Sequence, residues 1–121
     1  MSSQDFQINK RPLARHKLVD FFGCNPVVLS FAKYLEPIMM DASQKAGCKI
    51  VGIKAHQFNP VGATVVVLVA ESHFSIHTWP EHNKALVDVF ASGDMDLNAA
   101  IDHIHKAIGA TSRKVIDIER G

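Results

Sequence analysis

The sequence has little of several features that define whole classes of protein. It contains only two cysteines, Cys24 and Cys48, which are too few for a disulfide framework or a four-cysteine zinc site. Its formal net charge of +1 gives neither a basic stripe for nucleic acid nor an acidic tail. The longest apolar run, "VGATVVVLVA" at 61–70, has about half the length of a membrane span. Binding to nucleic acid or to a membrane is therefore not expected.

The chain also lacks the features of secreted and disordered proteins. Its N-terminal stretch, "MSSQDFQINKRPLARHK", has no apolar segment of the kind found in signal peptides, and no repeat or low-complexity run follows it. Apolar residues make up 47% and charged residues 21% of the 121 residues, which excludes a largely disordered chain. We therefore expect one cytoplasmic domain over residues 1–121, either an enzyme or a binding module.

Local patterns predict five strands and two helices. Apolar alternation and β-branched residues favour strands at 15–23, 48–58, 63–70, 85–92 and 113–120. The run at 63–70 indicates a strand buried on both faces and paired in a hairpin with the strand before it. Helical spacing over 26–47 and 97–109 ends at a glycine in each case, with a kink or break expected at Pro37. This order is typical of an α+β fold, a two-layer αβ sandwich with a mainly antiparallel sheet and two helices on one face.

The stretch "VLVAESHFSIHTWPE" at 67–81 passes from a buried strand to a group of reactive side chains. His73 and His77 lie four apart, and the run "HFSIH" favours a strand on which both share a face. A zinc site would need a third protein ligand, for which Asp88 and Glu81 are candidates that no spacing singles out. No metal is assigned.

Ser72, next to histidines and an acid, offers the residue types of a catalytic triad. No Gly-x-Ser-x-Gly elbow surrounds it, and adjacent strand residues face opposite ways. From the residues alone, a nucleophile, a metal site and polar positions on a solvent-facing sheet all stay open. His103 and His105 diverge on the second predicted helix and are expected at the surface.

The segment "AESHFSIHTWPE", followed by "VDVF" and "SGD", resembles the bacterial and archaeal class of S-adenosylmethionine decarboxylase, a pyruvoyl-dependent enzyme. The resemblance runs from "HKLVDFFGC" through "GCKIVGIKAHQFNPVGAT" to the terminal Arg120-Gly121, so it covers most of the chain. It implies one decarboxylase-like domain that acts on S-adenosylmethionine for polyamine (spermidine) synthesis.

The resemblance also implies that the bond between Glu71 and Ser72 is broken by the chain itself. In the family, the serine hydroxyl attacks the preceding carbonyl, and elimination and hydrolysis then leave a pyruvoyl group on the new N-terminus. Carried over here, Ser72 becomes the cofactor that forms a Schiff base with the substrate amine. His77 matches the family's processing histidine, and Thr64 matches a serine that assists processing.

Other matches concern the substrate and the assembly. Phe58 matches an aromatic residue that stacks on adenine, and Glu81 matches the carboxylate that holds the ribose hydroxyls. His73 is expected as a wall of the site, and Trp79 either contacts the substrate or packs structurally. Family members pair their sheets and share active sites between chains. The resemblance therefore implies a homodimer or a higher homo-oligomer.

The sequence departs from the family pattern at the proton donor. Where the family has Thr-Cys-Gly, this chain has Ala91-Ser92-Gly93, and a serine hydroxyl is a far weaker acid than a thiol of pKa about 8.5. The two cysteines of the chain lie elsewhere in the pattern. Ser92 therefore marks the position of the donor. The departure leaves two alternatives open, a pyruvoyl-dependent ornithine or arginine decarboxylase and a non-catalytic homologue.

Overall fold

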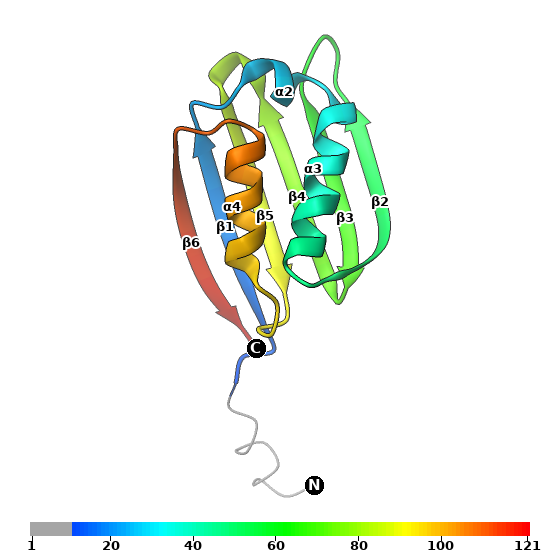
Figure 1. Ribbon diagram of the computed structural model, residues 1–121, viewed down its shortest axis with the longest axis vertical. Helices are drawn as coiled ribbons and strands as arrows, with labels where there is room; N and C mark the ends of the chain where they lie inside the picture. The colour runs from blue at the N-terminus through cyan, green and yellow to red at the C-terminus, as the bar shows by residue number, and fades with distance from the viewer. Residues whose placement is uncertain (1–10) are drawn as a thin grey trace, which may run out of the picture.

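The computed structural model describes residues 11–121 as a six-stranded sheet with its helices on one side (Figure 1). The strand order is β2-β3-β4-β5-β1-β6, and every neighbouring pair is antiparallel, which confirms the predicted two-layer α+β sandwich. In chain order the elements are β1 (Ala14–Phe22), α2 (Pro26–Ser30), α3 (Ala32–Lys45), β2 (Lys49–Gln57), β3 (Ala63–Ala70), β4 (Ser72–Trp79), the 3-10 helix η1 (Pro80–His82), β5 (Lys84–Ala91), α4 (Leu97–Ala107) and β6 (Ser112–Arg120). Residues 1–10 of the predicted domain lie outside the described residues, and no described helix is long and apolar enough to span a bilayer.

The first predicted helix is divided at Phe31 and not at Pro37. α2 ends at Ser30, Phe31 has extended backbone with φ −128° and ψ 128°, and α3 then continues through Pro37. At the break, the carbonyl oxygen of Ser30 accepts a hydrogen bond from the N–H of Gly62 at 3.0 Å. The expected break is therefore present, but its predicted place is wrong, because hydrogen bonds to a distant loop hold the chain at Phe31.

The hydrophobic core lies between the helices and the face of the sheet that they cover, here called the covered face. Val65 and Val67 of β3 and Phe74 and Ile76 of β4 point into this core and are fully buried. The stretch "HFSIH" forms part of β4, as predicted, and this strand brings the sheet to six. The fully buried helical side chains include Leu29 of α2, Leu35, Met39, Ala42 and Ser43 of α3, and Ala100, Ile101 and Ile104 of α4.

The opposite side of the sheet, here called the open face, carries no helix of the described chain (Figure 1). The prediction that β3 is buried on both faces is wrong for a single chain. Val65 and Val67 are buried on the covered face, whereas Val66 is half-buried and Leu68 is 51% exposed on the open face. Other exposed apolar side chains on the open face are Leu86 of β5 and Ile116 and Ile118 of β6. The open face therefore leaves several apolar side chains in contact with solvent.

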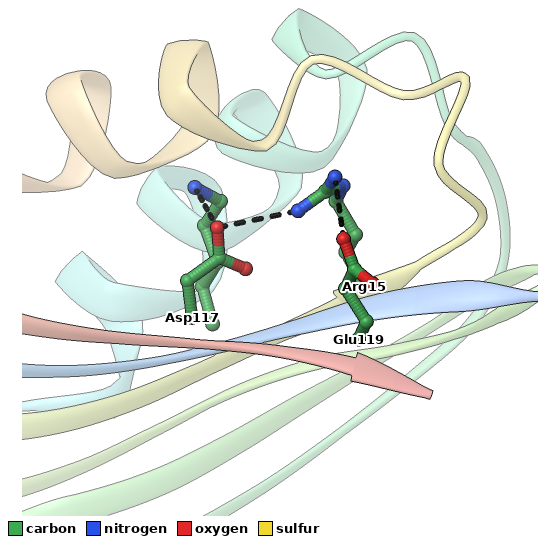
Figure 2. A network of polar contacts seen from close by, with 4 residues as sticks. Arg15, Asp117 and Glu119 are labelled. Atoms are coloured by element: carbon green, nitrogen blue, oxygen red, sulfur yellow. Dashed lines mark hydrogen bonds and ion pairs between the residues drawn. The ribbon is translucent and has the colours of Figure 1, made fainter. Parts of the chain in front are cut away.

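Strand β6 forms one edge of the sheet, and a small ion-pair network joins it to β1. Arg15 pairs with Asp117 at 3.4 Å and with Glu119 at 3.2 Å, and Lys17 pairs with Asp117 at 3.3 Å. Figure 2 shows Arg15, Asp117 and Glu119 on the side of the sheet that carries the helices. Because both acids are well exposed, each pair contributes about 1 kcal/mol or less. Charges along an edge strand also hinder unwanted pairing with other strands.

Candidate active site

The bond between Glu71 and Ser72 lies in the tight turn that joins β3 to β4. Val69 pairs with Ser72 across this turn, so Ala70 and Glu71 connect the two strands, and Glu71 is exposed. Ser72 has a φ of 111°, a backbone conformation that favours glycine. Such a conformation costs a residue with a side chain about 1–3 kcal/mol. The predicted cleavage site is therefore an exposed peptide bond next to strained backbone.

Five predicted site residues come together at the other end of β4, around a cavity of about 420 Å³. These residues, called the pocket group below, are Phe58, Thr64, His77, Trp79 and Glu81. Thr64 Oγ1 and His77 Nδ1 form a hydrogen bond of 2.9 Å between β3 and β4. Phe58 is 48% exposed and Trp79 is 41% exposed. Exposed rings beside an imidazole and a carboxylate can bind a flat polar ligand and move a proton.

The remaining predicted residues lie at the Ser72 end of the sheet. This set, called the turn group below, consists of Glu71, Ser72, His73 and Ser92. β4 and β5 pair with His73 opposite Phe90, which places Ser92 at the end of β5 beside the turn. The rings of His73 and Phe90 meet edge to face with centroids 5.7 Å apart. Ser92 lines a separate cleft of about 440 Å³ with Arg11 and Arg15.

The two groups do not meet within one chain. Ser72 and His77 are five residues apart on β4, and a strand rises about 3.3 Å per residue, so roughly 17 Å separates them. His73 and His77 share the open face, as predicted, but they contact different partners. Among residues 11–121, no three His, Cys, Asp or Glu side chains are grouped to hold a metal ion. One chain thus places the cavity and the turn before Ser72 at opposite ends of β4.

A polar network that the sequence reasoning missed crosses the open face between these groups. His16 Nε2 lies 3.0 Å from Asp88 Oδ1, and Ser75 Oγ donates to Asp88 Oδ2 at 3.1 Å. Arg120 reaches His16 Nδ1 at 3.3 Å, so the network joins β6, β1, β5 and β4. Its signal in the sequence was an aspartate inside the apolar strand "ALVDVFA". The network gives the apolar open face a hydrogen-bonded polar centre.

The histidines of α4 take no part in either group. His105 packs edge-on against Phe21 with ring centroids 5.7 Å apart, and His103 is half-buried with its Nε2 atom enclosed. Both side chains therefore lie only partly at the surface, since each is half-buried. Each is one residue from the buried Ile104, about 100° around the helix, so the two imidazoles flank the buried stripe.

Neither cysteine replaces the missing thiol at position 92. Cys24 is 1% exposed and Cys48 is 6% exposed. Burial raises the pKa of Cys24 to about 11, although a backbone hydrogen bond with Ala85 opposes the rise. Burial also raises the pKa of Cys48. A buried thiol that resists ionisation is a poor nucleophile and a poor acid.

Comparison with known proteins agrees with the motif around Ser72. The family described as S-adenosylmethionine decarboxylase has a sequence model that matches residues 15–121. A protein of Anoxybacillus flavithermus named S-adenosylmethionine decarboxylase proenzyme is 37% identical over 109 residues, which cover 90% of this chain and 88% of the relative. The chain belongs to the S-adenosylmethionine decarboxylase family.

Other members of the S-adenosylmethionine decarboxylase family agree in sequence and in structure. A proenzyme of the same name from Thermotoga petrophila is 38% identical over 112 residues, covering 92% of this chain and 86% of the relative. The crystal structure of the adenosylmethionine decarboxylase from Aquifex aeolicus matches with a TM-score of 0.85 at 34% identity, and the match covers 92% of each chain. The resemblance inferred from the motif is thereby confirmed.

The buried thiols lead to a test of reactivity. In folded protein at about pH 8, iodoacetamide should label Cys24 and Cys48 slowly, because a raised thiol pKa leaves little thiolate at that pH. Mass spectrometry of the alkylated chain measures the labelling, and the same protein unfolded in urea serves as the fully reactive control. Rapid labelling of Cys24 in the folded protein would contradict its burial.

Proposed function

We propose that this protein is a self-processing, pyruvoyl-dependent decarboxylase that acts on S-adenosylmethionine and supplies polyamine (spermidine) synthesis in the cytoplasm. The observation that carries the proposal is Ser72, which lies in strained backbone at an exposed turn, within the family motif. The relatives described above are named as proenzymes, which supports cleavage of this chain. None of them favours an ornithine or arginine substrate.

The cleavage itself uses the chain's own atoms. Ser72 Oγ attacks the carbonyl carbon of Glu71 and converts the amide into an ester. Elimination releases residues 1–71 with a carboxylate end, and water then displaces the remaining nitrogen as ammonia to leave a pyruvoyl group at position 72. The exposed turn admits this water, and breaking the bond relieves the strain at Ser72. The group supplies the electron-withdrawing carbonyl that decarboxylation needs.

The pocket group suits the nucleoside part of the substrate. A cavity of about 420 Å³ lies within the usual range for small-molecule sites. Phe58 offers an exposed ring on which adenine can stack, and Glu81 offers a carboxylate that accepts hydrogen bonds from the two ribose hydroxyls. The ring of Trp79 and the carboxylate of Glu81 can also attract the positively charged sulfonium group of S-adenosylmethionine. His73 is proposed to form a wall of the active site next to Ser72, where the substrate reacts.

Two chains are needed to bring the two groups together. The open face is apolar, and two sheets pack face to face at about 10 Å. A two-fold axis that lies between the two open faces and runs perpendicular to the strands would place the pocket group of one chain over the turn group of the other. His77, hydrogen-bonded to Thr64, would then accept the proton of the partner chain's serine hydroxyl at position 72. We therefore propose a homodimer, or a higher assembly built from it.

Self-processing is the first test of this function. Purified protein should separate into fragments 1–71 and 72–121, and the second fragment should resist Edman sequencing because it lacks a free amine. Ser72→Ala should abolish cleavage, and His77→Ala should slow it at least tenfold through loss of the base, as mass spectrometry over time would show. Ser112→Ala, an exposed serine of β6, is the control and should cleave normally. A wild-type chain that stays intact after long incubation would count against the proposal.

Shared sites make a second prediction about mixtures of inactive chains. A Ser72→Ala chain co-expressed with a Glu81→Gln chain should recover decarboxylase activity that neither chain has alone, because one site of the mixed dimer keeps both native residues. Phe58→Ala with Glu81→Gln is the control and should show no recovery, since both changes lie in the pocket group. Absence of recovery in the first mixture, or a monomer by light scattering, would rule out the shared site.

Ser92 generates a third prediction, on the return of a proton to the substrate carbon after carbon dioxide leaves. With a poor donor the proton can be delivered to the wrong carbon, so the wild-type protein should lose activity with turnover. Ser92→Cys should raise kcat and slow that loss, because a thiol is a much stronger acid than a serine hydroxyl. Each tenfold gain corresponds to about 1.4 kcal/mol of barrier. Ser112→Cys adds a thiol away from the site and controls for unspecific effects. No change in kcat or in inactivation would show that the donor lies elsewhere.

A further inference from the structure

The side-chain amide of Gln57 joins three segments next to the pocket group. Gln57 is the last residue of β2, is half-buried, and does not line the cavity itself. Its Oε1 accepts a hydrogen bond from the N–H of Ala32 at 2.7 Å. Its Nε2 donates to the carbonyl oxygens of Ser30 at 2.8 Å, Phe58 at 2.9 Å and Gly62 at 3.0 Å. One amide thus connects the α2–α3 break, the end of β2 and the loop that follows it.

The first of these bonds acts as a helix cap. The first four N–H groups of an α-helix have no partner within the helix. Phe31, which precedes α3, makes no side-chain capping bond. Gln57 Oε1 satisfies the N–H of Ala32, the first residue of α3, from 25 residues away in the sequence. The start of α3 is therefore tied to the end of β2.

The other bonds hold the wall of the cavity. An amide NH₂ has two hydrogens, so the three carbonyl oxygens share them. The carbonyl oxygen of Gly62 also accepts from the N–H of Phe58 at 2.8 Å, and the N–H of Gly62 donates to Ser30 at 3.0 Å. Gly62 has a φ of 101°, and a Cβ there would lie 3.4 Å from the carbonyl oxygen of Thr78. Phe58 and Gly62 both line the cavity, so the side-chain amide of Gln57 fixes the position of this part of the cavity wall.

We propose that Gln57 is a positioning residue for the nucleoside end of the substrate, because it holds Phe58 and Gly62 against the α2–α3 break. The inference rests on the ligand class proposed for this pocket, and it requires neither the cleavage at Ser72 nor the proton donor at position 92. A residue that acts on the non-reacting end of a substrate changes binding more than the chemical step. Loss of the amide should therefore raise KM and leave kcat and self-cleavage unchanged.

The test uses the fluorescence of Trp79, the one tryptophan in the chain, which lines the cavity. Gln57→Leu removes all four hydrogen bonds at similar volume, and Gln44→Leu makes the same change at an exposed site on α3 as the matched control. Titration with 5′-methylthioadenosine gives a Kd that does not depend on catalysis. We expect the Kd and KM of Gln57→Leu to rise about tenfold, or about 1.4 kcal/mol, with wild-type values for the control.

A second variant separates the helix cap from the pocket wall. Gln57→Glu keeps the acceptor for the N–H of Ala32 but loses the donors to the three carbonyl oxygens. It should keep Ala32 protected from amide exchange, whereas Gln57→Leu should not. It should nevertheless weaken the binding of 5′-methylthioadenosine as much as Gln57→Leu does. If Gln57→Leu does not fold, the Kd of Gln57→Glu for 5′-methylthioadenosine tests the positioning role by itself.

Several outcomes would overturn the positioning role. Wild-type values of Kd and KM in Gln57→Glu would overturn it. A variant with a lower Tm and less cleaved chain but an unchanged Kd would also overturn it, because that result indicates a merely structural role. A wild-type protein that does not bind 5′-methylthioadenosine would also overturn it. If wild type binds 5′-methylthioadenosine but does not decarboxylate S-adenosylmethionine, the proposed function fails, whereas a raised Kd in Gln57→Glu still supports the positioning role.

Discussion

The two-residue period of the antiparallel sheet is the constraint on which the rest of this structure depends. Along β4 it directs Phe74 and Ile76 into the core and His73, Ser75 and His77 onto the open face. A register slip of one residue would exchange these sets, burying imidazoles among aliphatic side chains and exposing aromatic ones. The register that builds the core therefore also brings the two imidazoles of β4 to the face that no described helix covers.

The open face combines apolar side chains with one satisfied polar network. Both carboxylate oxygens of Asp88 have partners, His16 and Ser75, and the side chains of His16 and Asp88 are already only 17% and 30% exposed. If a second chain covers this face, as proposed above, the network would lose its remaining water and keep its hydrogen bonds. A satisfied polar centre lowers the cost of burial, and its directional bonds restrict how two such faces can align. Apolar contacts such as those of Leu68 have no comparable directionality.

The two reactions proposed at Ser72 make different demands on the chain. Cleavage needs a hydroxyl, a base and a strained exposed bond. The turn supplies the hydroxyl and the bond, and the proposed base is His77 of a second chain. Decarboxylation also needs an acid beside the reacting carbon, where this chain has Ser92. The buried cysteines offer no replacement, because desolvation raises both thiol pKa values. The chain is therefore better equipped for cofactor formation than for the final proton transfer.

Much of this protein follows from short stretches of its sequence. The apolar run "ATVVVLVA", the glycines that end the helices and the motif around Ser72 act over a few residues. They were enough to predict the sandwich and the family, and the cleavage site between Glu71 and Ser72 stays a prediction. The sequence did not reveal the helix break at Phe31 or the hydrogen-bond network of Asp88. Nor did it reveal that roughly 17 Å separates the turn group from the pocket group. Strand register and hydrogen bonds between distant residues, such as Gln57 and Ala32, decide these features, and such contacts exist only once the chain has folded.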